Sequence, residues 1–327
     1  MPQKIGIPRT LGYYDYYPFW QTFLENIGLQ VIASTNSNKD VLDAGVRVTI
    51  NDACIPIKLM HGHVIDLREK ADYIFLPRLV SVRKLKNETF CPKFLGLPDM
   101  VKSAIDNLPE IIDNRIELAL GRLERFRLCV ELGKRFGSSL GQVTKAYWNA
   151  VLVNRKYQLL LRRRMTPMEA MEVLDGRSEP SKKKAHPLSL AVIGYPYTVY
   201  DNFLNVNLLS LLQKLEVQVY TADMIAPGLL LRQKKRLPKN LFWHFSNRAM
   251  QAALYFIYGR RVDGIIHVTA FGCGPDAMVG RMIELEAKQA GRIPFLSLSV
   301  DEHTGEAGIH TRAEAFVDML KMKRGIL

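Results

Sequence analysis

An internal repeat is the feature that most restricts how this chain can fold. When the sequence is compared with itself at a shift of 188 positions, residues 7–34 align with residues 195–222 without a gap. The identical positions include Pro8 with Pro196, which stand where each copy turns. A chain of 327 residues is also long for a single core. The sequence therefore predicts two similar packed units.

Both copies have the pattern that opens a parallel sheet. Each has a short apolar strand, a Gly-x-Pro turn, an amphipathic helix and a second apolar strand. Strands alternating with helical stretches predict an α/β protein with two doubly wound parallel-sheet halves. The expected strands are Ile5–Ile7, Leu29–Ala33, Asp72–Pro77, Leu190–Ile193, Val217–Thr221, Asp263–Val268 and Pro294–Val300.

The region between the two copies has helical periodicity. We expect helices over Ile111–Phe136 and Leu140–Met165, then a short helix with Thr166 as its N-cap and Pro167 in its first turn. The polar, proline-bearing stretch that follows is typical of a linker. The predicted organisation is a first half at 1–98, a helical insert at 99–175, a linker at 176–187 and a second half at 188–327.

Composition narrows the possible environments of the protein. Four cysteines are too few for a disulfide scaffold, and we expect a reducing, cytoplasmic location. The sequence contains no long uncharged apolar run, so we expect no membrane span. A net charge of +13 suits an acidic partner or a phosphate-bearing substrate. We expect no nucleic-acid binding, because no binding motif accompanies the basic runs at 162–164, 182–184 and 232–236.

Three cysteines share one kind of setting. Cys54, Cys91 and Cys273 each lie in a loop beside Pro or Gly, where a strand gives way to a helix. In parallel sheets these loops meet at the carboxyl edge, where ligands bind. Soft thiolates select iron-sulfur clusters, zinc or copper, and three thiolates leave one iron of a cubane open. We therefore predict a [4Fe-4S] cluster between the halves, with a zinc site or unrelated packed cysteines as the alternatives.

Other residues are weaker candidates. Cys129 lies mid-helix among apolar residues and is expected to pack in the core. Glu302 and His303 follow the last strand, so they are candidate catalytic residues, with loop capping as the alternative. Six further candidates are charged or histidine side chains near the cysteines or the strand ends. Lys58, Lys93 and Arg9, with Arg78, could offset cluster charge or bind a phosphate of coenzyme A, and His61 or His63 could approach the cluster.

Several segments together resemble a known family. They include Asp52-Ala-Cys-Ile-Pro-Ile-Lys58, Cys91-Pro-Lys-Phe-Leu-Gly-Leu-Pro-Asp99 and Asp301-Glu-His-Thr-Gly-Glu306. The chain resembles the uncharacterised domain associated with 2-hydroxyacyl-CoA dehydratase activases. That domain is similar to the dehydratase component itself and to benzoyl-CoA reductase and double-cubane cluster proteins. The resemblance implies two Rossmann-like domains and a cluster on three cysteines.

The resemblance also implies a function. The relatives receive low-potential electrons from an ATP-hydrolysing, dimeric iron-sulfur activator. The expectation for this chain is a dehydratase-like redox protein that passes an electron to an acyl-CoA-like substrate or a partner, as a homodimer or a heterodimer with a dehydratase-like subunit. The chain has no phosphate-binding Gly-rich loop, so we do not expect it to hydrolyse ATP. The alternatives are a non-catalytic electron-transfer or cluster-holding subunit and a metal-binding or metal-free α/β ligand-binding module.

Overall fold

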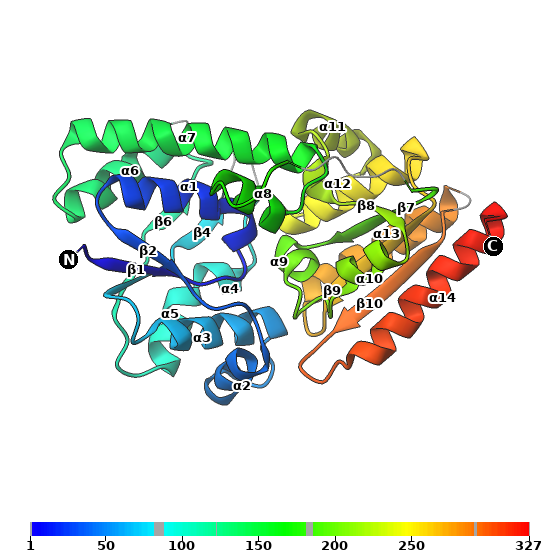
Figure 1. Cartoon of the computed structure of the whole chain (residues 1–327), viewed down its shortest axis with the longest axis horizontal. Coiled ribbons are helices and arrows are strands. Elements are labelled where there is room, and N and C mark those ends of the chain that lie inside the picture. Colours follow the sequence, from blue (N-terminus) through cyan, green and yellow to red (C-terminus); the bar gives the residue numbers. More distant parts are fainter. Residues whose placement is uncertain (1, 82–87, 122, 181–185, 291–292, 327) are drawn as a thin grey trace.

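The computed structural model describes residues 2–81, 88–121, 123–180, 186–290 and 293–326. Two parallel sheets lie in separate halves of the molecule, each flanked by helices (Figure 1). This arrangement confirms the predicted α/β architecture. Part of the predicted linker, including the basic run 182–184, lies outside the described residues. None of the described helices is both long enough and apolar enough to cross a bilayer.

The first sheet has the strand order β2-β1-β3-β5 and is parallel throughout. Ile5 in its central strand pairs with Val31 on one side and Tyr73 on the other. A separate two-stranded parallel sheet joins β4 to β6. The strands of this half are β1 (Lys4–Ile7), β2 (Gln30–Ala33), β3 (Tyr73–Phe75), β4 (Arg78–Ser81), β5 (Glu110–Ile112) and β6 (Arg115–Glu117).

The second sheet repeats the plan of the first. Its order is β10-β9-β7-β8, again all parallel, so β7, β8, β9 and β10 take the places of β1, β2, β3 and β5. The internal repeat of the sequence therefore corresponds to a repeat of sheet topology. The strands are β7 (Leu188–Gly194), β8 (Val217–Tyr220), β9 (Gly264–Ala270) and β10 (Phe295–Val300).

Helices connect the strands of both halves. The helices before the second sheet are α1 (Tyr13–Asn26), α2 (Lys39–Val48), α3 (Ile55–Leu67), α4 (Pro92–Leu95), α5 (Leu97–Ala104), α6 (Glu124–Arg135), α7 (Leu140–Arg162) and α8 (Pro167–Leu174). Those of the second half are α9 (Pro196–Tyr200), α10 (Leu208–Lys214), η1 (Ala222–Met224), α11 (Pro227–Arg232), η2 (Gln233–Arg236), α12 (His244–Gly259), α13 (Gly274–Gln289) and α14 (Glu306–Arg324).

The long helix α7 ties the halves together. It packs on α1 of the first half and on η1 of the second (Figure 1). The hydroxyl of its buried Tyr157 donates to the carbonyl oxygen of Tyr14 at 2.6 Å. The predicted short helix after it is also present, with Thr166 and Glu169 forming a capping box.

Two helix predictions were wrong in part. The helix predicted over Ile111–Phe136 begins only at Glu124, because the preceding residues form β5 and β6. Ile111 and Ile112 are β-branched and buried against β3, which favours a strand. The single helix predicted in the second repeat copy is divided into α9 and α10. Asp201 after α9 is extended, with ψ of 111°, and Asn207 before α10 is left-handed, with φ of 56°, so one helix cannot run through this segment.

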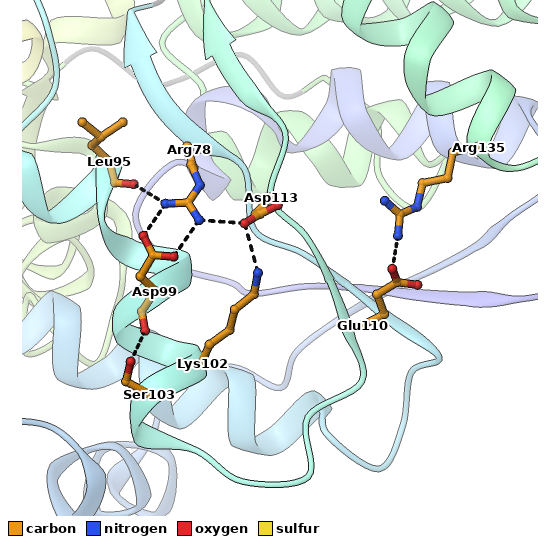
Figure 2. Close-up of polar contacts among 8 residues, drawn as sticks. All are labelled: Arg78, Leu95, Asp99, Lys102, Ser103, Glu110, Asp113 and Arg135. Atoms are coloured by element: carbon orange, nitrogen blue, oxygen red, sulfur yellow. Dashed lines mark hydrogen bonds and ion pairs between the residues drawn. The ribbon is translucent and has the colours of Figure 1, made fainter.

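Arg78 stabilises the junction of β4, β5 and α5 (Figure 2). Its Nη2 donates to Asp99 at 2.7 Å and to Asp113 at 2.8 Å. Lys102 donates to the same Asp113 carboxylate at 3.1 Å, and Arg135 pairs with Glu110 nearby. The Arg78 guanidinium is therefore paired with two carboxylates of the protein itself. These pairs account for its position without a bound ligand.

The crossing of α2 and α3 is unusually close and sets the position of the first cysteine loop. A Cβ placed on Gly62 of α3 would lie 1.8 Å from the carbonyl oxygen of Val41, and one on Gly45 of α2 would lie 1.8 Å from that of Lys58. No side chain fits at either point. The start of α3, directly after Cys54, is thereby fixed against α2.

The substitution Gly62→Ala tests this crossing. Its methyl group would meet backbone, so we expect the free energy of unfolding to fall by about 3 kcal/mol, measured by urea denaturation. Gly228→Ala in α11 is the matched control, because a Cβ there meets nothing within 4 Å, and it should change stability by less than about 1 kcal/mol. Equal stability of the two variants would contradict the proposed contact.

Candidate functional site

Each of the three cysteines stands at the start of a helix. The prediction that each loop leads from a strand to a helix was wrong for Cys54, whose loop joins α2 to α3. Cys54, Cys91 and Cys273 are the N-cap residues of α3, α4 and α13, and each helix has Pro in its first turn. Proline favours this place because the first turn needs no backbone N–H bond. The local sequence thus starts a helix immediately after each thiol.

All three cysteines line one small cavity between the halves. Its volume is about 30 Å³, and Lys93 also lines it. The loops that carry Cys54 and Cys273 lie against each other: a Cβ on Gly272 would be 3.8 Å from the Cα of Cys54. Gly272 has φ of +77°, a conformation that glycine adopts without strain. Residues more than two hundred positions apart therefore meet at this site.

The thiols lie in an environment that disfavours their charged form. Burial raises the pKa of Cys54, while the Lys93 ammonium acts in the opposite direction. Burial also raises the pKa of Cys273 to about 12. Negative charge at Cys91 contributes to both increases, because like charges repel. Cys54 and Cys273 are therefore protonated at neutral pH unless a cation compensates their charge, as a bound metal does.

The cysteines and their neighbours do not form a binding site for a single metal ion. Among the described residues, no three or more His, Cys, Asp or Glu side chains lie close enough to hold one metal ion. This geometry does not provide a mononuclear zinc site in that part of the chain, since zinc requires its ligands around one atom. A four-iron cluster differs because it distributes its thiolate ligands over separate irons.

Lys58 and Glu302 pair with each other. Lys58 is 4% exposed, and its Nζ lies 2.5 Å from Oε1 of Glu302, which follows β10 in the other half. Neither residue lines the cysteine cavity. The neighbouring His303 is exposed, and its backbone N–H donates to Asp301 at 2.9 Å. Thr304 also donates to Asp301, so this turn has the hydrogen bonds of a capped loop.

The other predicted residues bond elsewhere. Arg9 donates to Asn36 at 2.7 Å and lies over the ring of Tyr13. His61 bonds the carbonyl oxygen of Ile57 at 2.8 Å. None of these residues lines the cysteine cavity. Cys129 is fully buried in α6, as expected for a core residue.

His63 belongs to a buried hydrogen-bond chain between the halves. Its two ring nitrogens bond the hydroxyl groups of Ser34, at 2.9 Å, and Ser37, at 3.0 Å. Ser37 in turn donates to Asp201 of the second half. Burial lowers the pKa of His63 to about 4, so the ring is neutral at physiological pH. Its role here is to join the two halves.

Sequence reasoning missed the aromatic wall of the cysteine cavity. Two of its members flank Cys91 and the others come from the second half, far from the cysteines in the sequence, namely Phe90 and Phe94, then Tyr195, Tyr197, Trp243 and Phe245. One signal was present: the Tyr-Pro-Tyr turn at 195–197 is the repeat partner of the Ile-Pro-Arg turn at 7–9. Both turns follow the central strand of a sheet, at the edge where the site lies.

Comparison with known families gives two matches. A family model described as the CoA enzyme activase uncharacterised domain matches residues 4–225, about two thirds of the chain. A model described as the D-component of 2-hydroxyglutaryl-CoA dehydratase matches residues 211–320. The first match contains Cys54 and Cys91, and the second contains Cys273. A search of curated proteins gave no match to the chain.

The Lys58–Glu302 pair gives a pH-dependent prediction. The hydrogen bond from Lys58 lowers the pKa of Glu302 from its ordinary 4.5. A carboxyl group whose pKa is lowered on folding stabilises the folded state fully at a pH above its ordinary pKa. This contribution is lost as the pH falls through the lowered pKa. Glu302→Gln should therefore reduce the free energy of unfolding by about 1–2 kcal/mol at pH 7, since Glu302 is partly exposed. Below about pH 4 the difference from the wild type should shrink.

Urea denaturation at both pH values measures this effect. Asp43→Asn is the control, because it removes the exposed partner of Lys39 and should have an effect below about 0.5 kcal/mol. A Glu302→Gln effect that is as small as the control at pH 7, or that grows in acid, would show that the pair does not join the halves.

Proposed function

The chain belongs to the family described as the CoA enzyme activase uncharacterised domain, and we propose that it is an iron-sulfur redox protein. In this proposal Cys54, Cys91 and Cys273 hold one [4Fe-4S] cluster. The protein accepts a low-potential electron from an ATP-hydrolysing iron-sulfur activator and passes it to an acyl-CoA-like substrate or a partner. The unpaired state of all four cysteines supports a reducing, cytoplasmic location.

One observation carries the proposal. Three cysteines that are far apart in the sequence begin three helices and line a single cavity. The longer helices, α3 and α13, direct their positive ends toward Cys54 and Cys273. This potential favours thiolates, which are the ligands of iron-sulfur clusters. The donor set therefore fits the cluster in number and in chemistry.

The remaining groups around the cavity suit a charged cofactor. Lys93 supplies a positive charge, and the aromatic wall partly covers the thiols, which are half-buried. Burial raises the pKa values of Tyr195 and Tyr197, so both rings stay neutral and add no further negative charge. When bound, a cluster would supply one-electron transfer at an iron that has no protein ligand. The cavity has space for about one water molecule as it stands, so cluster insertion requires the cysteine loops to move apart.

The partners follow from the family. The second match is to a dehydratase component, which supports a dehydratase-like role and assembly with a related subunit. The net charge of +13 suits an acidic partner and the phosphates of coenzyme A. A second candidate is an electron relay without its own substrate. The small volume of the cysteine cavity favours this candidate, because the loops would have to move further apart to admit a substrate than to admit the cluster alone.

Anaerobic reconstitution with iron and sulfide tests the cluster. We expect about four irons per chain in the wild type and loss of most of that iron in Cys54→Ser, Cys91→Ser and Cys273→Ser, because each removes a thiolate. Cys129→Ala is the matched control, since this thiol is buried in α6 away from the cavity. It should retain the iron. Iron that survives the triple replacement would exclude these cysteines as ligands.

Titration of the reduced, reconstituted protein with an acyl-CoA separates the two candidates. A change in the electron paramagnetic resonance signal of the cluster on addition of the thioester supports the catalytic role. An unchanged signal, together with electron transfer to a second protein, supports the relay.

A further inference from the structure

A larger cavity lies next to the cysteine site and is not used by the proposed function. Its volume is about 260 Å³, and residues of both halves line it. His244 lines both cavities and so forms part of the wall between them. The volume is slightly below the usual range for ligand pockets, about 300–1,000 Å³, so a ligand must be small.

One part of the cavity wall carries excess negative charge. Asp15 and Asp223 both pair with the single guanidinium of Arg248, at 2.5 Å in the case of Asp15. The Tyr200 hydroxyl donates to Oδ2 of Asp223, so both carboxylate oxygens of Asp223 have a partner. Asp15 differs, because it is 9% exposed and its Oδ2 has no hydrogen-bond donor among the described residues. A buried carboxylate oxygen without a donor is unfavourable, so a ligand that donates N–H bonds would stabilise it.

Another part of the wall carries a positive charge that no carboxylate neutralises. The guanidinium of Arg125 lies over the rings of Phe19, at 4.9 Å, and Tyr147, at 5.6 Å. Within the part of the chain that the structure describes, it forms no ion pair. Stacking on rings leaves the N–H edge of a guanidinium able to bind a carboxylate. Asn154 and Gln158, one turn apart on α7, add amide groups to the same cavity.

Apart from Tyr16 and His244, the rest of the lining is apolar. It includes Trp20, Ile116, Leu118, Ile225 and Leu230. A purely anionic ligand would leave Asp15 without a donor, a purely cationic one would leave Arg125 without an acceptor, and a hydrocarbon would satisfy neither. A zwitterion with an apolar side chain satisfies all three parts of the wall.

We propose that this cavity binds a free amino acid with an apolar side chain. The ammonium group bonds the Asp15 carboxylate, the carboxylate group bonds Arg125, and the side chain contacts the apolar lining. The site is separate from the cysteines and does not depend on a cluster. Its occupant would touch both halves of the protein.

Isothermal titration calorimetry on the full chain, without added iron, tests the proposal. The probes are L-leucine, L-methionine and L-phenylalanine. 4-Methylpentanoate lacks the ammonium group of leucine and 3-methylbutylamine lacks its carboxylate, so each should bind at least about tenfold more weakly than leucine. The proposal is overturned if none of the three amino acids binds at concentrations up to about 10 mM, or if a singly charged analogue binds equally well.

Variants locate the binding. Arg125→Met and Asp15→Asn each remove one charged contact and should weaken binding about tenfold or more. Ala222→Leu fills the cavity without changing a charge and should abolish binding. Arg127→Met is the matched control, because this residue is on the same helix, is exposed and does not line the cavity. Circular dichroism verifies the fold of each variant.

Wild-type affinity in Ala222→Leu would place the ligand elsewhere and refute the site. Wild-type affinity in Arg125→Met or Asp15→Asn would refute the assigned contact. These measurements need no iron, so their failure would leave the iron-sulfur proposal intact. Amino-acid binding is measured on protein without a cluster, so loss of iron from the cysteine variants would not refute it.

Discussion

Parallel pairing of the central strands fixes the position of the whole candidate site. β1 pairs with β3 and β7 with β9, so the loops that follow them leave from the carboxyl edge of each sheet. These edges face each other across the middle of the molecule (Figure 1). Gly272 directly follows β9 at this edge, and it contacts the loop of Cys54 at the start of α3. The parallel sheets therefore place the Cys273 loop at the boundary between the halves, and the packing of α3 brings Cys54 to it.

The interface that follows from this arrangement is strongly polar. Lys58 pairs with Glu302, Arg248 with Asp15, and Glu88 with His244 at 2.5 Å, and each pair joins the two halves. Buried ion pairs contribute little net stability, because desolvation offsets most of their attraction. Their geometry is demanding, however, and a mismatched partner leaves a buried charge. These pairs therefore select one relative position of the halves, which is what a ligand set divided between them requires.

The sequence was sufficient to predict the sheets but not all of their members. The apolar runs predicted β7 and β9, and the repeat predicted that both halves begin with the same strand-helix-strand unit of a parallel sheet. Neither signal predicted β5, a strand of three residues. In the first sheet β5 has the position that β10 has in the second. Strands of this length have too few residues for a periodic signal. Their structure depends on pairing with a distant strand, which a local pattern does not record.

The candidate site, like the sheets, could be predicted only in part from local sequence patterns. The three cysteines were singled out because each lies in a loop beside Pro or Gly before an expected helix, and that signal is local. Their role as ligands stays a prediction. The pairing of Lys58 with Glu302, 244 positions away, has no local signal, so both were assigned to cofactor or catalytic roles instead. The aromatic wall and the larger cavity arise only when the two halves pack, and composition could not indicate them.

The two cavities are physically linked through the interface. Residues of both halves line each of them, and His244 lines both. A small molecule in the larger cavity would bind only the arrangement in which Asp15 and Arg125 face the second half. By mass action it would stabilise that arrangement by RT ln(1 + [L]/Kd). The same arrangement brings Cys54 and Cys91 to Cys273, so occupancy of one cavity favours the geometry of the other.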